Sequence, residues 1–150
     1  MEQKRKVLPP VYFLMSLVAT AILHYALPIT RLVSPPYIYS GVVLIVAGIA
    51  IATVASGAFR RAGTPVVPFE PSTALITDGL YRVTRNPMYL GLLLTLAGVA
   101  ILCGTLGAFL PLPVFFWILR SQFVIPEERF LEGIFGAQYL DYKRRVRRWL

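Results

Sequence analysis

An apolar stretch without a single charged residue, residues 37–59, limits most strongly what this chain can fold into. A helix needs about 20 mostly apolar residues to cross the hydrocarbon core of a bilayer. Three further apolar runs cover residues 8–27, 88–102 and 106–125, and the last two are separated so narrowly that they predict a tight helical hairpin. The chain is therefore predicted to be an all-α, polytopic membrane protein with about four transmembrane helices.

The composition agrees with a membrane protein and sets metal and disulfide chemistry aside. Hydrophobic residues make up 57% of the 150 residues and charged residues 15%, whereas a soluble domain has roughly a quarter of its residues charged. A chain of this length is expected to be a single domain, 1–150. One cysteine, Cys103, excludes an intrachain disulfide, and one histidine, His24, with seven carboxylates forms no metal-binding motif. The first apolar run is interpreted as a retained span rather than a cleaved signal peptide.

The basic residues lie so unevenly about the four predicted spans that they orient the chain. Four spans put both termini on one side, the other side receives only Arg31, and Arg120 lies within the fourth span. The basic residues on the side of the termini are Lys4, Arg5, Lys6, Arg60, Arg61, Arg82, Arg85, Arg129, Lys143, Arg144, Arg145, Arg147 and Arg148. Because cytoplasmic loops carry the excess of basic residues, both termini are predicted to be cytoplasmic. The net charge of +8 then indicates anionic membrane lipids as partners, and not nucleic acid.

Two helical patterns predict how the spans continue and pack. Apolar residues recur at steps of three or four after the fourth span, which predicts a cytoplasmic amphipathic helix over residues 127–149 at the membrane interface. This apolar stripe comprises Leu131, Phe135, Tyr139, Tyr142, Val146 and Trp149. On the second span, the small residues Gly48, Ala52 and Ser56 recur at every fourth position. Such a face lets helices approach closely and permits a homodimer.

Polar residues at two span boundaries form the candidate site. Asn86 is a favourable N-cap and Pro87 suits the first helical position, so the third span is predicted to begin here with free N–H groups. Glu127 and Glu128 follow the fourth span directly. Each feature also has a plain structural explanation, as a helix entering a bilayer and as a solvated first helical turn. In a four-span order, however, both features lie on the same cytoplasmic face.

Together these residues suit a ligand with both kinds of charge. The helix start, strengthened by Arg85, offers a seat for an anion, and the rings of Tyr81 and Tyr89 offer faces to a cation. S-adenosylmethionine has a carboxylate, a cationic centre and an ammonium group, and its adenosine needs a partly apolar slot. The long loop, residues 60–87, is predicted to be ordered, and its segment STALITDGLY could wall that slot.

The segments LITDGLYRVTRNPMYLG and PEERFLEGIFGAQYLDYKRRVRRW resemble the isoprenylcysteine carboxyl methyltransferase and phospholipid methyltransferase superfamily. The resemblance covers roughly residues 60–150 and implies a small integral membrane enzyme that uses S-adenosylmethionine. The family motif Arg-His-Pro-x-Tyr-x-Gly is met here with Asn86 at the histidine position. The resemblance and the residues together predict a cofactor site made of Thr73, Ala74, Leu75, Ile76, Tyr81, Arg85, Asn86, Pro87, Met88, Tyr89, Glu127 and Glu128.

The predicted function is methyl transfer from S-adenosylmethionine to a lipophilic acceptor, either a prenylcysteine-like carboxylate or a lipid head group. Tyr89 and Asn86 are predicted catalytic residues, although asparagine cannot titrate near neutral pH. Arg120 is the third, because a charge inside a span is costly and indicates function. The prenylcysteine branch has an arginine where this chain has Phe123, one turn after Arg120. Two alternatives stay open: a membrane reductase on a related helical frame, and a non-enzymatic lipid-binding membrane protein.

Overall fold

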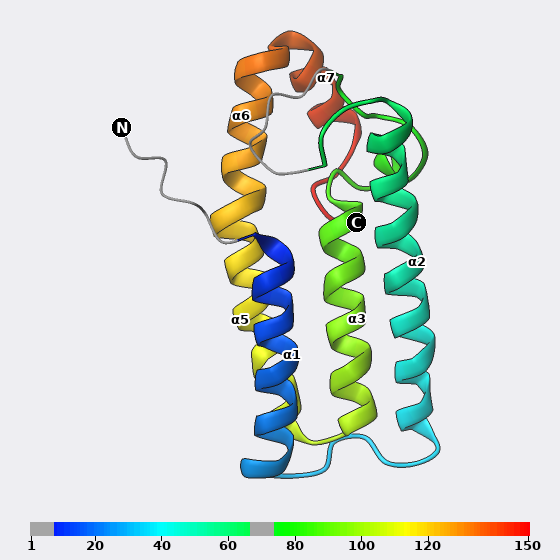
Figure 1. Cartoon of the computed structure of the whole chain (residues 1–150), viewed down its shortest axis with the longest axis vertical. Coiled ribbons are helices and arrows are strands. Elements are labelled where there is room, and N and C mark those ends of the chain that lie inside the picture. The colour runs from blue at the N-terminus through cyan, green and yellow to red at the C-terminus, as the bar shows by residue number, and fades with distance from the viewer. Residues whose placement is uncertain (1–7, 67–73) are drawn as a thin grey trace.

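The computed structural model describes residues 8–66 and 74–150, and these form an all-helical protein (Figure 1). Within these ranges the only β-type pairings are isolated bridges, Arg31 with Thr105 and Thr84 with Arg147. The elements in chain order are α1 (Pro9–Ala26), η1 (Tyr37–Tyr39), α2 (Ser40–Arg61), η2 (Gly79–Arg82), α3 (Pro87–Cys103), α4 (Leu106–Phe109), α5 (Pro111–Ile118), η3 (Leu119–Val124), α6 (Ile125–Phe135) and α7 (Ala137–Arg145).

Three helical stretches are long and apolar enough to cross a membrane, Pro9–Ala26, Tyr37–Arg61 and Leu106–Phe135. A shorter apolar helix, α3, lies lengthwise beside them (Figure 1). Large apolar side chains on the outer faces are exposed, for example Leu14 on α1 and Val43 on α2, as expected of surfaces that meet lipid. The prediction of an all-α membrane protein is thus confirmed, whereas a fourth crossing by α3 stays a prediction.

The boundary between the fourth span and the C-terminal helix differs from the prediction. The sequence predicts a span that ends at residue 125 and a new helix that begins at 127, but helical structure is continuous from Leu106 to Phe135. Pro126 lacks an N–H and its ring crowds the preceding turn. The residues just before it, η3, are π-helical, and such a widened turn accommodates the proline without ending the helix.

The predicted single amphipathic helix over residues 127–149 is wrong, because the chain turns at Gly136. This glycine has a φ of 51° and separates α6 from α7, and left-handed φ values favour residues without a Cβ. After α7, Val146 is extended, and the chain returns towards α3 (Figure 1). The residues Tyr139, Tyr142 and Val146 of the predicted stripe are buried. These three residues of the stripe therefore pack into the protein interior.

Glycines bring α2 and α3 into backbone contact. A Cβ added to Gly41 would lie 2.3 Å from the carbonyl oxygen of Gly98, and one added to Gly48 would lie 2.5 Å from that of Gly91. A Cβ added to Gly91 would come 2.8 Å from the Cβ of Ala52. Gly48 and Ala52, on which the expected homodimer contact rests, are therefore used within the chain. The homodimer itself stays a prediction.

Two apolar clusters join this helix pair to the rest of the chain. One fills the space between α3 and the α5–η3 stretch, with Tyr89, Leu96, Phe115, Leu119, Phe123 and Val124. The other connects α2, η2 and α7 through Ala55, Tyr81, Tyr139, Tyr142 and Val146. At the opposite end, Gly104 with a φ of 71° ends α3 and allows the tight hairpin that the sequence predicts. The two clusters meet near the start of α3, where the predicted site residues lie.

Candidate functional site

The first turn of α3 and the first turn of α6 meet through a side-chain hydrogen bond. Pro87 is buried at the start of α3 and fixes where this helix begins. The hydroxyl of Tyr89 then donates to Oε2 of Glu127 at 3.1 Å. The structure thus brings the start of α3 and the start of α6 together, as the sequence predicts.

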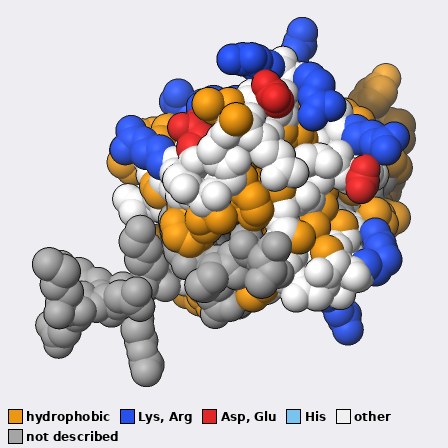
Figure 2. Space-filling model, turned by 90° about the horizontal axis from the view of Figure 1, so that it is seen from above, with side chains coloured by type: hydrophobic (Ala, Val, Ile, Leu, Met, Phe, Trp, Pro, Cys, Tyr) orange, Lys and Arg blue, Asp and Glu red, His pale blue; other side chains and the backbone are white. Residues whose placement is uncertain are grey.

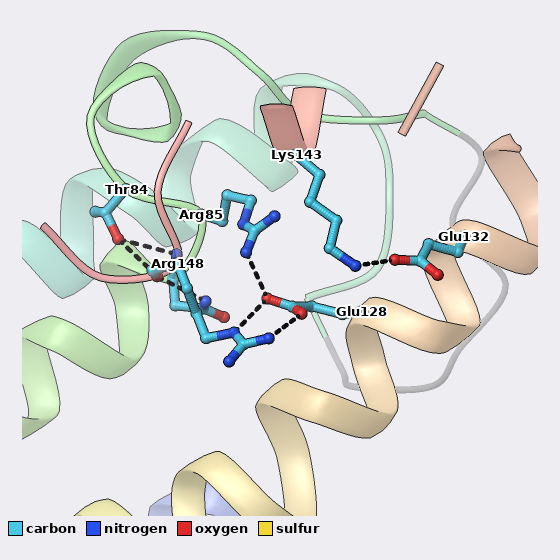
Figure 3. A network of polar contacts seen from close by, with 7 residues as sticks. Thr84, Arg85, Glu128, Glu132, Lys143 and Arg148 are labelled. Atoms are coloured by element: carbon cyan, nitrogen blue, oxygen red, sulfur yellow. Dashed lines mark hydrogen bonds and ion pairs between the residues drawn. The ribbon is translucent and has the colours of Figure 1, made fainter. Parts of the chain in front are cut away.

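Glu128, the next residue, lies in a buried cluster with two arginines (Figure 3). Nε and Nη2 of Arg148 donate to its two carboxylate oxygens at 2.9 and 2.8 Å. Nη2 of Arg85 lies 3.0 Å from Oε1 of the same carboxylate, and both of these side chains are only 7% exposed. Glu128 is therefore held by three charge-assisted contacts and is not a solvated first turn.

The chain after α7 is fixed beside the start of α3 by its backbone. We call residues 146–149 the C-terminal segment. The N–H of Arg85 donates to the carbonyl of Arg147 at 2.9 Å. The carbonyl of Arg148 accepts from the side chains of Thr84 at 3.1 Å and Asn86 at 2.9 Å. The segment thereby joins the loop before α3 to the carboxylate on α6.

Asn86 occupies the N-cap position of α3 but does not act as the predicted side-chain cap. Its side chain makes no capping hydrogen bond, and its Nδ2 amide group donates to the carbonyl of Arg148 at 2.9 Å. Its backbone N–H is satisfied by the hydroxyl of Thr84 at 3.2 Å. The Asn86 side chain therefore fixes the C-terminal segment, and the first N–H groups of α3 carry no side-chain cap.

A cavity of about 310 Å³ opens where these elements meet. Ten of the residues predicted for the cofactor site line it: Ala74, Leu75, Ile76, Tyr81, Arg85, Asn86, Met88, Tyr89, Glu127 and Glu128. Sequence reasoning missed the lining residues Leu8, Pro9, Pro10, Ala52, Phe59, Val66, Leu92, Val124, Leu131, Tyr139 and Tyr142. Leu131, Tyr139 and Tyr142 lie in the second segment that resembles the superfamily, which is the signal that could have found them. Most of the others are apolar, and no local signal separates them from residues that face lipid.

Three predicted residues are placed elsewhere or are not described. Pro87 is buried beneath the first turn of α3 and does not line the cavity. Thr73 lies outside the described residues. Arg120 is exposed on η3 and is not among the residues that line the cavity, so the structure does not bring it together with Tyr89 and Asn86.

The cavity wall combines neutral phenols with an arginine that has unused donors. Burial raises the pKa of Tyr81, Tyr139 and Tyr142, so these hydroxyls stay protonated at neutral pH. The hydroxyl of Tyr142 donates to the carbonyl of Tyr81 at 2.7 Å, which fixes the loop before α3. Among the described residues, Nε and Nη1 of Arg85 are buried without a hydrogen-bond partner. Buried donors of this kind suit an anionic group of a ligand.

This chain is similar in sequence to a family of known proteins and to several curated relatives. The family described as Phospholipid methyltransferase matches residues 36–138. Protein-S-isoprenylcysteine O-methyltransferase A of Arabidopsis thaliana is 33% identical over 109 residues, 71% of this chain and 55% of that protein. The probable protein-S-isoprenylcysteine O-methyltransferase of Oryza sativa subsp. indica is 32% identical over 111 residues, 72% and 58% of the two chains. The protein-S-isoprenylcysteine O-methyltransferase of Schizosaccharomyces pombe is 33% identical over 72 residues, 48% and 30% of the two chains. The chain thus spans little more than half the length of the plant relatives.

Proposed function

Because this chain belongs to the phospholipid methyltransferase family, we propose that it transfers a methyl group from S-adenosylmethionine to a lipophilic acceptor at the membrane. The names of its relatives indicate the methyltransferase class. The observation that carries the proposal for this chain is the cavity between the starts of α3 and α6, where Tyr89 and Glu127 are joined by a hydrogen bond. Single-domain organisation over residues 1–150 is part of the proposal.

The lining residues fit the charges of S-adenosylmethionine. Nε and Nη1 of Arg85, which have no hydrogen-bond partner in the described part of the chain, match a carboxylate, and the carboxyl group of Glu127 matches an ammonium or sulfonium centre. The ring of Tyr89 offers a further face to a cation, and Leu75 and Ile76 offer an apolar wall to the adenosine. The volume of about 310 Å³ falls at the lower end of the roughly 300–1,000 Å³ common for small-molecule sites.

Methyl transfer requires the protein to align the acceptor atom with the methyl group and to exclude water from the site. When bound, S-adenosylmethionine supplies a methyl group on a positively charged sulfur. The residues of this chain must hold the acceptor atom in line with that group and keep water out. Apolar walls from α1 and η3, including Pro9 and Val124, contribute to excluding water.

The acceptor that best suits these residues is a carboxylate, because it is already ionised at neutral pH and needs no general base. The amide of Asn86 is bound to a backbone carbonyl and does not titrate. The one histidine, His24, lies near the far end of α1, where Nδ1 is 2.9 Å from the hydroxyl of Thr105. A prenylcysteine-like carboxylate is therefore favoured over a protonated amine, and a lipid head group stays the second choice.

Sidedness follows from the basic residues. Lys and Arg side chains surround the end of the molecule that carries the cavity (Figure 2), whereas Arg31 pairs with Thr105 at the opposite end. We infer that four helices cross the membrane, α3 included, and that the cavity, α7 and both termini are cytoplasmic. The lipophilic part of the acceptor enters from the bilayer between α1 and the η3–α6 stretch, whose residues Pro9 and Leu131 line the cavity.

Ligand-induced stabilisation tests the function directly. The purified protein in detergent is heated with S-adenosylhomocysteine, and a ligand at 100 times its Kd should stabilise the folded state by about 2.7 kcal/mol. A reduced nicotinamide dinucleotide serves as the control for a reductase and should give no shift. Labelled methyl donor with a panel of prenylcysteine and phospholipid acceptors then identifies the product. Absence of both a shift and a labelled lipid product would refute the proposal.

A further inference from the structure

Among the described residues, the ion-pair cluster around Glu128 contains two arginines and one carboxylate. Arg85 and Arg148 each carry one positive charge and share the single carboxylate of Glu128 (Figure 3). Arg85 is 7% exposed at its side chain, so water compensates little of its charge. A buried cation without its own counter-charge is costly, which indicates that a further anion completes the cluster when a ligand is bound.

The two arginines do not use Glu128 in the same way. Arg148 contacts both carboxylate oxygens through Nε and Nη2, which is the two-pronged geometry that a guanidinium forms best. Arg85 contacts one oxygen through Nη2 alone and leaves Nε and Nη1 without a partner among the described residues. If Arg148 were absent, the guanidinium of Arg85 could form the two-pronged contact with both carboxylate oxygens of Glu128.

Arg148 is held in place independently of its own side chain. Its carbonyl accepts hydrogen bonds from Thr84 and Asn86. The next residue, Trp149, packs against Phe116 with ring centroids 5.3 Å apart. The guanidinium of Arg148 is therefore presented to Glu128 by a fixed backbone.

From this geometry we propose that Arg148 is a positioning residue for the ligand site. By occupying both oxygens of Glu128, it leaves the Nε and Nη1 donors of Arg85 available to a carboxylate in the cavity. The inference rests on the proposed function, because the carboxylate belongs either to the amino-acid part of S-adenosylmethionine or to a carboxylate acceptor. Arg148 does not line the cavity, so its effect on the ligand passes through Glu128 and Arg85.

The test compares ligands with and without the carboxylate. S-adenosylhomocysteine has an amino-acid carboxylate, whereas 5′-methylthioadenosine has the same nucleoside without it. Affinities are measured for the wild type, Arg148→Gln, Arg148→Lys and the control Arg147→Gln. Arg147 is the adjacent arginine, its side chain is exposed, and its contact with Arg85 uses the backbone carbonyl, which the substitution keeps. The KM for a prenylcysteine acid is measured in parallel.

We expect Arg148→Gln to lose about tenfold or more in affinity for S-adenosylhomocysteine, the size of one charged hydrogen bond, and to keep its affinity for 5′-methylthioadenosine. Arg148→Lys keeps the positive charge but cannot contact both carboxylate oxygens of Glu128 at once, so its affinity for S-adenosylhomocysteine should lie between those of the wild type and Arg148→Gln. The affinity of Arg147→Gln should match that of the wild type. A rise in KM confined to the prenylcysteine acid would support the same role with the acceptor as the source of the carboxylate.

Three results overturn the inference and one overturns its premise. Equal losses for both nucleosides in Arg148→Gln would show general damage to the fold, and equal effects of Arg147→Gln and Arg148→Gln would show a simple loss of surface charge. Either result removes the positioning role. If the wild type binds neither nucleoside, the proposed function fails first. An unchanged affinity and an unchanged KM in Arg148→Gln, with normal binding by the wild type, would refute the inference alone.

Discussion

Replacing Glu128 with glutamine should destabilise the protein far more than other changes on the same helix. The substitution keeps the shape of the side chain but removes the charge that Arg85 and Arg148 share. Arg148 is 32% exposed and can turn towards water, whereas Arg85 is 7% exposed and cannot. Leaving one buried charge without its partner costs about 3–5 kcal/mol. For a chain of this size, such a loss lowers the Tm by roughly 6–20 °C.

The assay follows thermal unfolding in detergent by circular dichroism, with Glu132→Gln as the matched control. Glu132 also lies on α6, one turn after Glu128, and pairs with Lys143 where both side chains are about a third exposed. An ion pair of this kind contributes roughly 0.2–1 kcal/mol. The double variant Arg85→Gln with Glu128→Gln should recover part of the loss, because the unpaired buried charge is then removed. Equal Tm values for Glu128→Gln and Glu132→Gln would show that the cluster is not a buried charge network.

Three further substitutions test the site and the packing. Tyr89→Phe removes the hydrogen bond to Glu127 and should weaken S-adenosylhomocysteine binding by about tenfold; an unchanged Kd in calorimetry would exclude a role for this bond in the ligand site. Gly48→Leu should lower the Tm or abolish folding, because its Cβ would lie 2.5 Å from a carbonyl oxygen of α3, whereas Gly57→Leu, whose nearest neighbour is 3.4 Å away, should have little effect. If Arg120 is catalytic as predicted, Arg120→Gln should raise the KM for a carboxylate acceptor. Steady-state kinetic constants equal to those of the wild type would contradict that prediction.

The sequence was sufficient to predict that Tyr89 and Glu127 lie at the same end of the molecule. Successive spans cross the membrane in opposite directions, so the number of apolar runs predicts the side on which each span begins and ends. This order puts the starts of α3 and α6 on the same side. The hydrogen bond between the two side chains agrees with that argument. Ten of the cavity residues were predicted from the resemblance to the methyltransferase superfamily together with the residues themselves, because the two segments that carry the resemblance, around Arg85 and around Glu127, are each contiguous in the chain.

Two parts of the site could not be predicted, for different physical reasons. Pro126 was taken as a helix boundary, but a π-helical stretch before it absorbs the missing hydrogen bond, and local sequence does not reveal such a change of pitch. Arg148 is predicted only as one of the thirteen basic residues on the side of the termini. Nothing in its neighbourhood distinguishes it from Arg147, since its partner Glu128 lies twenty residues earlier and is reached only after the turn at Gly136.

The glycine contacts between α2 and α3 limit which walls of the cavity can adapt to ligands of different size. At Gly41–Gly98 and Gly48–Gly91 the two backbones approach so closely that an added Cβ would lie 2.3–2.5 Å from a carbonyl oxygen, so this helix pair has little room to rearrange. We therefore expect α1 and the η3–α6 stretch to move when a bulkier acyl or prenyl chain binds. Differences in acceptor preference among variants of this protein should therefore arise from those two elements.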